Sequence, residues 1–505
     1  MKLSQLVDNF NELEMEDLEI KNIRYNSNDV EPGDLFVAIK GYVTDGHKYV
    51  KNAYESGAVV AIVEDYVEVD IPQIQVENSR IALADMSHKY FGEPSTKLNM
   101  VGITATNGKT TTSFMLDTIY RLDGYRTGII GTVYTKYADV MVPSILTTPE
   151  SYDLQRYLYD MVGNNIEKVT MEVSSSAQEL YRNKNIDFDI VTFNNFSREH
   201  IDQHGSFENY YKFKSRLIRE AQEKTACVLN MDFEEIERLA KETKGKVVAY
   251  SLENSNYDFT IKDLDLSTGF GKYRFEILKE VNFNGVKIAP DSFEVELSAS
   301  GFSSVMNSVA AIIVALLEGI DKEIIIKALK LFTGVERRCE MIYDGDFKVL
   351  DDHFANVRNI DVTLDTLKQM SYKDLHVLYA IRGSRGVELN RETSERMVEW
   401  FEDLHLTKVF ATLSKDVVGK KDIVLDEELE VFKEIMSAHN MEYEIIDTLA
   451  DAMKSVLGEI NEGDVLLLAG CQGMDKGAGF LYDELLAVGK PNLDILKDKV
   501  ENRIC

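Results

Sequence analysis

Short apolar runs alternate with segments of helical length along most of this chain, and that alternation is typical of repeated βα units. The runs predicted to be strands are residues 35–39, 58–63, 127–131, 168–173, 188–193, 347–350, 376–381, 408–412 and 464–468, and a buried strand end is predicted at Val101 and Ile103. Helical periodicity marks residues 81–91 and 303–325, and a charged helix is expected at 490–505. The pattern therefore predicts an α/β protein whose central part contains a mostly parallel sheet.

Breaks in this pattern divide the chain into three predicted domains, since 505 residues are too many for a single core. The N-terminal α/β domain covers residues 1–97 and ends at the linker Pro94-Ser95-Thr96, the central domain covers 98–332, and a further α/β domain covers 333–505. Residues 23–45 contain a turn at 31–34, and from the fold alone they are interpreted as a hairpin-like start to the first domain.

The segment 99–113, NMVGITATNGKTTTS, combines a strand end, a turn and a helix start. Backbone N–H groups at such a helix start point into the loop and bind phosphate. Lys109 would reach the β- and γ-phosphates, and the Thr110 hydroxyl would be a Mg²⁺ ligand. Ile103 stands where the usual leading glycine of such loops is expected. The context of strand and helix nevertheless predicts a nucleotide-binding loop.

Polar residues follow the other predicted strands of the central domain, where α/β proteins place their ligands. Thr147 and Thr148 are such residues, and Glu172 ends a strand as a plausible Mg²⁺ ligand or as a helix N-terminal charge. His200 and His204 have the i, i+4 spacing of a zinc pair, but the glutamate of an HExxH motif is missing. Zinc is therefore the less favoured interpretation of the two histidines.

The composition of the chain limits the classes of molecule that it is expected to bind. The chain has 86 acidic and 56 basic residues, for a net charge of −30, which opposes binding to nucleic acid or to an anionic membrane. Its start lacks a signal-peptide pattern, and no apolar run is long enough to span a bilayer. The four cysteines have neither metal spacing nor a pairing pattern. We expect a cytoplasmic, monomeric protein with reduced thiols.

Taken together, these motifs resemble those of the Mur ligases, over nearly the whole chain, and most closely the E-type member that adds the third residue to a UDP-N-acetylmuramoyl peptide. The matching segments are Ser27 with Pro32-Gly33-Asp34, the loop Thr106-Asn107-Gly108-Lys109-Thr110-Thr111, Thr147-Thr148-Pro149, Glu172-Val173-Ser174-Ser175, and residues 198–205. The resemblance implies a three-domain fold: a UDP-binding N-terminal domain, a central P-loop ATPase domain and a Rossmann-like acceptor domain.

The resemblance also implies roles for individual residues. Ser27 would contact the UDP end, whereas Thr147, Thr148, Ser174 and Arg182 would hold the muramoyl peptide. Thr110, Glu172, His200 and Lys214 would place Mg²⁺, with Lys214 carbamylated. A carbamate converts a cationic side chain into an oxygen donor suited to a hard cation. From the residues alone, the preferred interpretation of Lys214 is a surface lysine of an amphipathic helix, beside Lys212 and Arg216.

The third domain matches the family less closely. Arg338 fits its opening motif, Asp352 and Asn307 fall on nucleotide-contacting positions, and Arg391 falls on the arginine that grips the carboxylate of the incoming amino acid. Residues 413–418, LSKDVV, do not contain the Asp-Asn-Pro-Arg box that reads diaminopimelate, and residues 470–475 are altered. In the other two domains, Asn28, Ser176 and Leu180 also depart from the family's residues.

The sequence thus predicts an ATP- and Mg²⁺-dependent amide ligase that acts through an acyl phosphate on small-molecule substrates. Lys109, Lys214, His200 and Arg338 would be its catalytic residues. The favoured acyl substrate is a UDP-muramoyl peptide. One alternative is a paralogue that joins an amine to a different carboxylate outside the main cell-wall pathway, and another is a non-catalytic nucleotide-binding protein. The set of predicted metal ligands argues against the last alternative.

Overall fold

The computed structural model describes residues 1–12, 15–42, 44–197, 205–354, 356–501 and 503. They form two compact units, which are described separately. The first consists of Met1–Thr260, Glu276–Asp291 and Val309–Ile325. The second consists of Ile261–Phe275, Ser292–Ser308 and Ile326–Cys505, so it is assembled from three stretches of sequence.

The first unit begins with a small parallel sheet of strand order β1-β2-β3-β4. Its strands are β1 (Ile23–Arg24), β2 (Leu35–Val37), β3 (Val60–Val63) and β4 (Gln73–Gln75), and its helices are α1 (Leu3–Leu6), α2 (Val50–Glu55) and α3 (Ser79–Tyr90). The expected strands at 35–39 and 58–63 and the helix at 81–91 are confirmed. The hairpin-like start is wrong, because β1 and β2 run parallel, with Ile23 opposite Leu35.

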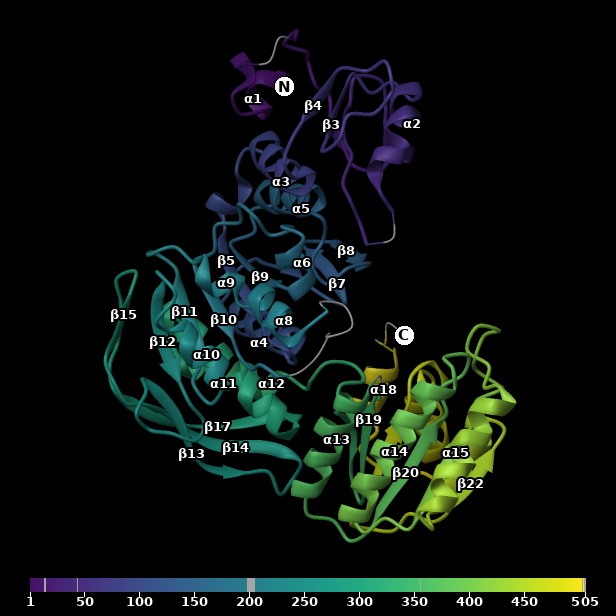
Figure 1. The fold of residues 1–505 in the computed structure, drawn as a ribbon. Helices are drawn as coiled ribbons and strands as arrows, with labels where there is room; N and C mark the ends of the chain where they lie inside the picture. The colour runs from purple at the N-terminus through teal and green to yellow at the C-terminus, as the bar shows by residue number, and fades with distance from the viewer. Residues whose placement is uncertain (13–14, 43, 198–204, 355, 502, 504–505) are drawn as a thin grey trace. The chain divides into compact units, whose positions relative to one another are not determined.

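In the first unit, a larger sheet has the strand order β12-β11-β10-β5-β9-β6-β7-β8 (Figure 1), and β13 adjoins β12. Its strands are β5 (Asn99–Thr104), β6 (Thr127–Ile130), β7 (Tyr134–Tyr137), β8 (Val140–Pro143), β9 (Lys168–Glu172), β10 (Ile190–Phe193), β11 (Ala226–Asn230), β12 (Lys246–Tyr250) and β13 (Phe259–Asp265). The neighbouring strands from β6 to β12 pair in parallel, as predicted, so their carboxyl ends share one edge.

Helices cover this sheet, and their apolar faces pack against its strands. Strand residues such as Val101 and Met171 are therefore fully buried. The helices are α4 (Lys109–Leu122), α5 (Ser151–Gly163), α6 (Ser175–Glu179), α8 (Phe207–Lys214), α9 (Arg216–Arg219) and α10 (Glu234–Leu239). A hairpin of β15 (Val281–Phe283) and β16 (Val286–Ile288) also belongs to this unit.

Two features between residues 259 and 331 differ from the sequence prediction. The expected helical stretch 303–325 is two helices, α11 (Gly301–Leu317) and α12 (Lys322–Leu331), separated near Gly319, whose φ of +79° ends α11. Residues 259–300 contain β13–β17, none of which was predicted.

The second unit contains a sheet of order β18-β19-β23-β20-β21-β22 in which only β18 is antiparallel to its neighbour. Its strands are β18 (Glu340–Asp344), β19 (Lys348–Asp352), β20 (Leu375–Ala380), β21 (Lys408–Thr412), β22 (Glu442–Ile446) and β23 (Val465–Ala469). The four predicted strands of this region are confirmed as β19, β20, β21 and β23. The sequence prediction missed the edge strands β18 and β22.

Helices of the second unit pack on both faces of this sheet, as in a doubly wound fold. One apolar cluster joins the sheet to α13 (Val357–Gln369), α14 (Val387–Asp403) and α15 (Asp426–Ala438), and another joins it to α16 (Leu449–Leu457), α17 (Gly477–Ala487) and α18 (Asp494–Glu501). The expected terminal helix is confirmed as α18.

The earlier stretches of the second unit supply β14 (Phe270–Ile277) and β17 (Asp291–Ser300). Phe270 packs against the cluster that contains Met341 and Met370, and the N–H of Ser371 donates to the carbonyl of Ser267 at 2.9 Å. These contacts attach residues 261–275 to the sheet that begins at β18.

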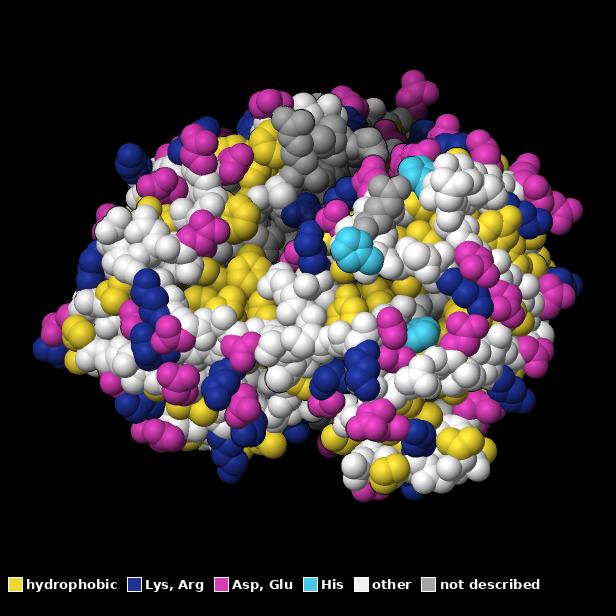
Figure 2. Space-filling model, turned by 90° about the horizontal axis from the view of Figure 1, so that it is seen from below, with side chains coloured by type: hydrophobic (Ala, Val, Ile, Leu, Met, Phe, Trp, Pro, Cys, Tyr) yellow, Lys and Arg dark blue, Asp and Glu magenta, His cyan; other side chains and the backbone are white. Residues whose placement is uncertain are grey.

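The surface in Figure 2 carries lysine and arginine side chains interspersed among acidic ones. In the part of the chain that the structure describes, no helix has the length and apolarity needed to cross a bilayer.

Candidate active site

The predicted phosphate loop lies where expected, between β5 and α4. Gly108 adopts a φ of +85° directly before Lys109, the first residue of α4. Asn195, which follows β10, fixes the loop from the side: its Oδ1 accepts the N–H of Asn107 at 2.9 Å, and its Nδ2 donates to the carbonyl of Asn107 at 2.8 Å. The structure therefore has the predicted order of strand, turn and helix start, and helix starts of this kind can bind anions.

Lys109 extends back over this loop. Its ammonium donates to the carbonyls of Ala105 at 2.9 Å and Thr106 at 3.1 Å. Thr110 and Thr111 follow in the first turn of α4 and are half-buried. A nucleotide phosphate bound at this helix start would meet the Lys109 charge and the Thr110 hydroxyl.

Glu172 ends β9, beside Ile103 of β5, and is fully buried. Thr132 holds both of its carboxylate oxygens: the Thr132 N–H donates to Oε1 and the hydroxyl to Oε2, each at 2.9 Å. The adjacent Gly131 has no room for a Cβ, because that atom would overlap the Glu172 carboxylate. The remaining lone pairs of this carboxylate suit a hard cation, so Glu172 fits the predicted magnesium role.

Replacing Thr132 by valine is expected to weaken divalent-cation binding about 10- to 100-fold, because the carboxylate would lose the hydroxyl that orients it. Titration of the protein with Mn²⁺, followed by electron paramagnetic resonance of free Mn²⁺, measures this without turnover. Thr132→Ser keeps the hydroxyl and should bind as the wild type does. Equal Mn²⁺ affinity of the valine variant and the wild type would contradict this role.

The predicted peptide-binding residues lie around the same edge. Thr148 is fully buried; its hydroxyl donates to the carbonyl of Glu172 at 2.8 Å and accepts the N–H of Ser174 at 3.1 Å. Thr147 Oγ1 lies 3.2 Å from Thr132 Oγ1. Arg182 is ion-paired with Glu150 at 2.9 Å. The structure thus brings together the residues that the sequence assigned to the acyl substrate.

Glu150 is shared between two arginines of the first unit. Its second carboxylate oxygen lies 3.0 Å from Nη1 of Arg80 on α3. Ser27 begins a short 3-10 helix, Ser27–Asp29, after β1 and is half-buried. Within the described residues, Ser27 makes no hydrogen bond with the residues around Glu172.

Lys214 ends α8 with only 2% of its surface exposed, so the surface-lysine interpretation is wrong. Its ammonium lies 5.0 Å from the ring centre of Tyr210, whose hydroxyl is 3.3 Å from that of Thr106 in the phosphate loop. Gln178 fixes the end of α8 by donating to the Lys214 carbonyl at 3.0 Å and accepting the N–H of Leu217 at 2.6 Å.

His200 and His204 lie outside the described residues. Among the residues that are described, no group of three or more His, Cys, Asp and Glu side chains is arranged to hold a metal. Of the predicted Mg²⁺ ligands other than Lys214, the Glu172 carboxylate and the Thr110 hydroxyl belong to described residues.

The remaining candidates belong to the second unit. Asn307 is buried in α11 and Arg338 is exposed. Asp352 ends β19 and accepts the N–H groups of Cys339 at 2.7 Å and Phe354 at 2.8 Å, yet burial raises its pKa to about 6. Arg391 lies on α14 and pairs with Glu434 of α15 at 3.0 Å.

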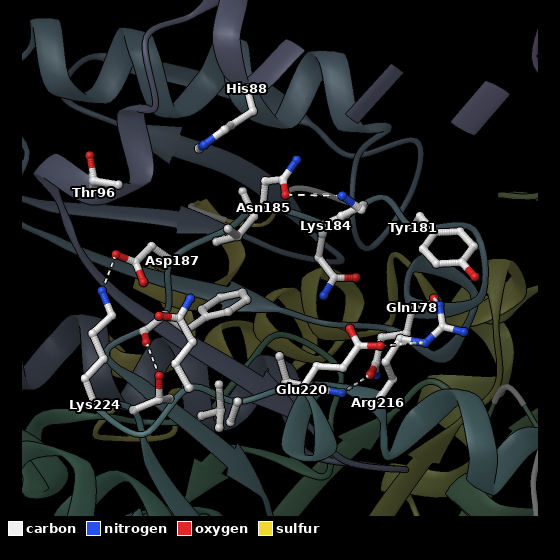
Figure 3. A pocket seen from close by; sticks show the side chains of 18 residues that line it. His88, Thr96, Gln178, Tyr181, Lys184, Asn185, Asp187, Arg216, Glu220 and Lys224 are labelled. Atoms are coloured by element: carbon white, nitrogen blue, oxygen red, sulfur yellow. Dashed lines mark hydrogen bonds and ion pairs between the residues drawn. The ribbon is translucent and has the colours of Figure 1, made fainter. Parts of the chain in front are cut away.

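A cavity of about 510 Å³ lies elsewhere in the first unit (Figure 3). Its wall includes residues that precede β10 and β11, so it opens at the amino ends of these strands, whereas the phosphate loop follows a carboxyl end. Its charged side chains bind one another: Lys224 pairs with Asp187 at 2.5 Å, and Arg216 lies 3.6 Å from Glu220. This cavity is distinct from the predicted nucleotide site.

Comparison with known proteins places this geometry in a family. Residues 103–315 match the family description "Mur ligase middle domain", residues 19–91 match "Mur ligase family, catalytic domain", and residues 337–472 match "Mur ligase, glutamate ligase domain". The chain is 31% identical to the UDP-N-acetylmuramoyl-L-alanyl-D-glutamate--2,6-diaminopimelate ligase of Clostridium botulinum over 90% of both chains. The chain belongs to the Mur ligase family.

Other relatives agree with this assignment. The Mur ligase described here is 30% identical to the enzyme of the same name from Listeria monocytogenes serotype 4b, over 100% of its own length and 97% of that relative. A solved structure of a diaminopimelate ligase of this name superposes with a TM-score of 0.68 at 22% identity and covers 91% of each chain. Thermotoga maritima MurF in complex with ADP superposes with a TM-score of 0.60 at 20% identity, over 94% and 100%. The α/β Mur ligase fold is therefore confirmed.

Three residues that support the site of this Mur ligase were not singled out in the sequence: Thr132, Asn195 and Gln178. Thr132 and Asn195 each lie two residues beyond the carboxyl ends of β6 and β10, and that position was an available signal. Gln178 had no comparable signal, because its role depends on the packing of α6 against α8.

Proposed function

We propose that this Mur ligase is an ATP-dependent acid–amino-acid ligase of the E type that adds an amino acid to a UDP-N-acetylmuramoyl peptide. The observation that carries the proposal is the arrangement of Lys109, Glu172 and Thr148 at the carboxyl edge of one sheet, in a chain whose relatives are named as ligases of this substrate class. The predicted domains 1–97, 98–332 and 333–505 would bind the uridine end, ATP and the amino acid.

The proposed reaction has two steps. A carboxylate oxygen of the acyl substrate attacks the γ-phosphorus of ATP, which forms an acyl phosphate and releases ADP. The amine of the amino acid then attacks the carbonyl carbon, the C–O bond to phosphate breaks, and phosphate leaves as the amide forms. In both steps, the protein supplies positioning and charge neutralisation.

The residues of this chain divide that work. Lys109 and the N–H groups of residues 106–111 would hold the phosphates, and Thr147, Thr148, Ser174 and Arg182 would position the acyl peptide. Thr110, Glu172, His200 and a carbamylated Lys214 would hold Mg²⁺, which neutralises developing charge on the phosphate when bound. Asn307 and Asp352 are proposed to bind the nucleotide, and Arg338 is proposed as a further catalytic residue. We place the monomeric enzyme in the cytoplasm, with ATP as its co-substrate.

Oxygen transfer tests this mechanism directly. Acyl substrate labelled with ¹⁸O in its reacting carboxylate should give inorganic phosphate that contains one ¹⁸O per turnover, measured by mass spectrometry, because the attacking oxygen leaves with phosphate. UDP-muramoyl dipeptide with a panel of amino acids is the first substrate set. Phosphate free of ¹⁸O from a reaction that yields amide would contradict the acyl-phosphate route.

A second candidate function is ligation of an amine to another carboxylate by the same chemistry. Asn28 favours it, because this exposed residue beside Ser27 replaces the family's arginine. Turnover with other carboxylates but none with UDP-muramoyl dipeptide would select this candidate.

Diaminopimelate is expected to be a poor acceptor. Val417 packs against a core cluster of the second unit, and Lys415 is paired with Asp447 at 2.8 Å, so the segment 413–418 presents no arginine to a distal carboxylate. An unpaired charged group costs about 1–3 kcal/mol or more, which corresponds to about one to two decades in kcat/KM.

Competition between diaminopimelate, lysine, ornithine and small neutral amino acids measures this preference. The exposed Lys420 and Lys421 are the alternative partners for a distal carboxylate. A tenfold or greater preference for diaminopimelate would contradict the prediction.

A further inference from the structure

Two backbone groups at the junction of α8 and α9 need partners from outside these helices. α8 ends at Lys214 and α9 begins at Arg216, so the carbonyl of Lys214 lies in the last turn of one helix and the N–H of Leu217 in the first turn of the next. Groups in these positions have no partner within their own helix. Lys214 and Leu217 are both buried, so another part of the fold must supply the hydrogen bonds.

Gln178 of α6 supplies both hydrogen bonds with one side chain. Its Nε2 donates to the carbonyl of Lys214 at 3.0 Å, and its Oε1 accepts the N–H of Leu217 at 2.6 Å. A side-chain amide suits this task because it carries a donor and an acceptor side by side. Gln178 is only 1% exposed, so the two bonds are shielded from water. The amide therefore holds the helix end that carries Lys214.

Arg216 links the same two segments in the opposite direction. Its guanidinium donates to the carbonyl of Gln178, and the central carbon of that group lies 4.5 Å from the ring centre of Tyr181. Figure 3 shows Gln178, Tyr181 and Arg216 along one side of the cavity. The end of α6 and the junction of α8 and α9 are thus joined by side chains from both.

The start of α6 is fixed to the strand end that carries Glu172. The side chain of Ser174 caps the first turn of α6. Thr148 accepts the N–H of Ser174 at 3.1 Å and donates to the carbonyl of Glu172 at 2.8 Å. Because α6 has only five residues, it forms a short connection between the end of β9 and the end of α8.

We propose that Gln178 is a positioning residue that sets the place of Lys214 for Mg²⁺ binding, by tying the helix end that carries Lys214 to the strand end that carries Glu172. This inference rests on the proposed function, which assigns Lys214 and Glu172 to the metal. Partners that orient metal ligands contribute to metal affinity although they do not touch the metal. Gln178 acts in this way, through Lys214 alone.

Titration with Mn²⁺, followed by electron paramagnetic resonance of free Mn²⁺, tests this role without turnover. Gln178→Met fills the space of the glutamine and makes neither hydrogen bond, so we expect Mn²⁺ to bind about 10- to 100-fold more weakly. Its carbamate carbon signal after equilibration with ¹³C-bicarbonate should also be smaller. Gln178→Glu keeps an acceptor for the Leu217 N–H but loses the donor to Lys214, so it too should bind Mn²⁺ more weakly.

Gln155 provides the matched control, since it is a second fully buried glutamine of the first unit, on α5. Gln155→Met should bind Mn²⁺ and give the carbamate signal as the wild type does. Circular dichroism and thermal unfolding establish that each variant is folded. Wild-type Mn²⁺ affinity in folded Gln178→Met and Gln178→Glu would overturn the proposal, because a residue that only stabilises the fold would give that result.

A second substitution shows whether Gln178 acts through Lys214. In a Lys214→Met background, the added Gln178→Met exchange should change Mn²⁺ affinity by less than about twofold, because the side chain that Gln178 positions is already absent. An equal loss of Mn²⁺ affinity in both backgrounds would overturn the proposal.

Failure of the ligase function would be seen separately, because Mn²⁺ binding and the carbamate signal require neither an acyl substrate nor ATP turnover. A wild-type protein whose Mn²⁺ binding depends on Gln178 and Lys214, but which forms no amide from UDP-muramoyl dipeptide or another carboxylate, would overturn the proposed function. The same result would support the positioning role of Gln178.

Discussion

Substitution of Lys109 by alanine is expected to lower ATP turnover by about 10²- to 10³-fold, because the charge that faces the β- and γ-phosphates is removed. The fold should survive, since Lys109 is only half-buried and its ammonium donates to the carbonyls of Ala105 and Thr106 within its own loop. Phosphate release with saturating substrates measures the effect, and circular dichroism and thermal unfolding establish that the variant is folded.

The exposed Lys246 at the start of β12 provides the matched control. Lys246→Ala removes the same charge from the same unit and should turn over ATP at the wild-type rate. A folded Lys109→Ala protein with wild-type phosphate release would rule out the nucleotide assignment of this loop.

Loss of Lys214 is expected to reduce ligase activity about 10²-fold or more, because a carbamate at this position would supply an oxygen donor for Mg²⁺. Lys214→Ala should regain part of its activity with added short-chain carboxylic acids, which can enter the space left by the side chain. Lys214→Met fills that space with an apolar chain and should not be rescued.

The modification itself can be observed without turnover. Protein equilibrated with ¹³C-bicarbonate should give a carbamate carbon signal in its NMR spectrum, and Lys214→Met should lack that signal. A nucleotide- and Mg²⁺-bound crystal grown with bicarbonate that holds an unmodified lysine would refute carbamylation.

Most strands of both sheets were predictable because parallel strands buried on two faces appear as continuous apolar runs. Residues 259–300 were missed for the opposite reason. β14 and β17 alternate buried and exposed residues, so neither forms an apolar run, although a period of two was present in the sequence. Helix α11 was predicted too long, because apolar residues continue past Gly319 into α12.

Candidate site residues could be predicted where they lie close together in one continuous segment, as in the phosphate loop. The contacts of the supporting residues were not predictable, because their partners come from other strands. Thr132 can hold Glu172 only because β6 pairs with β9, and that strand order is not written in local sequence. Lys214 presents the same problem: its surface-helix interpretation failed because burial against Tyr210 depends on tertiary packing.

The second unit is assembled from three stretches of sequence, so a fragment that contains only the last stretch would lack part of its core packing. A polypeptide that began at residue 333 would carry every strand from β18 to β23, yet it would lack residues 261–275. Phe270 would no longer cover the cluster around Met341 and Met370, and the Ser371 N–H would lose the Ser267 carbonyl. Such a fragment would expose methionine side chains to water and would tend to self-associate, so amino-acid screening calls for the entire chain.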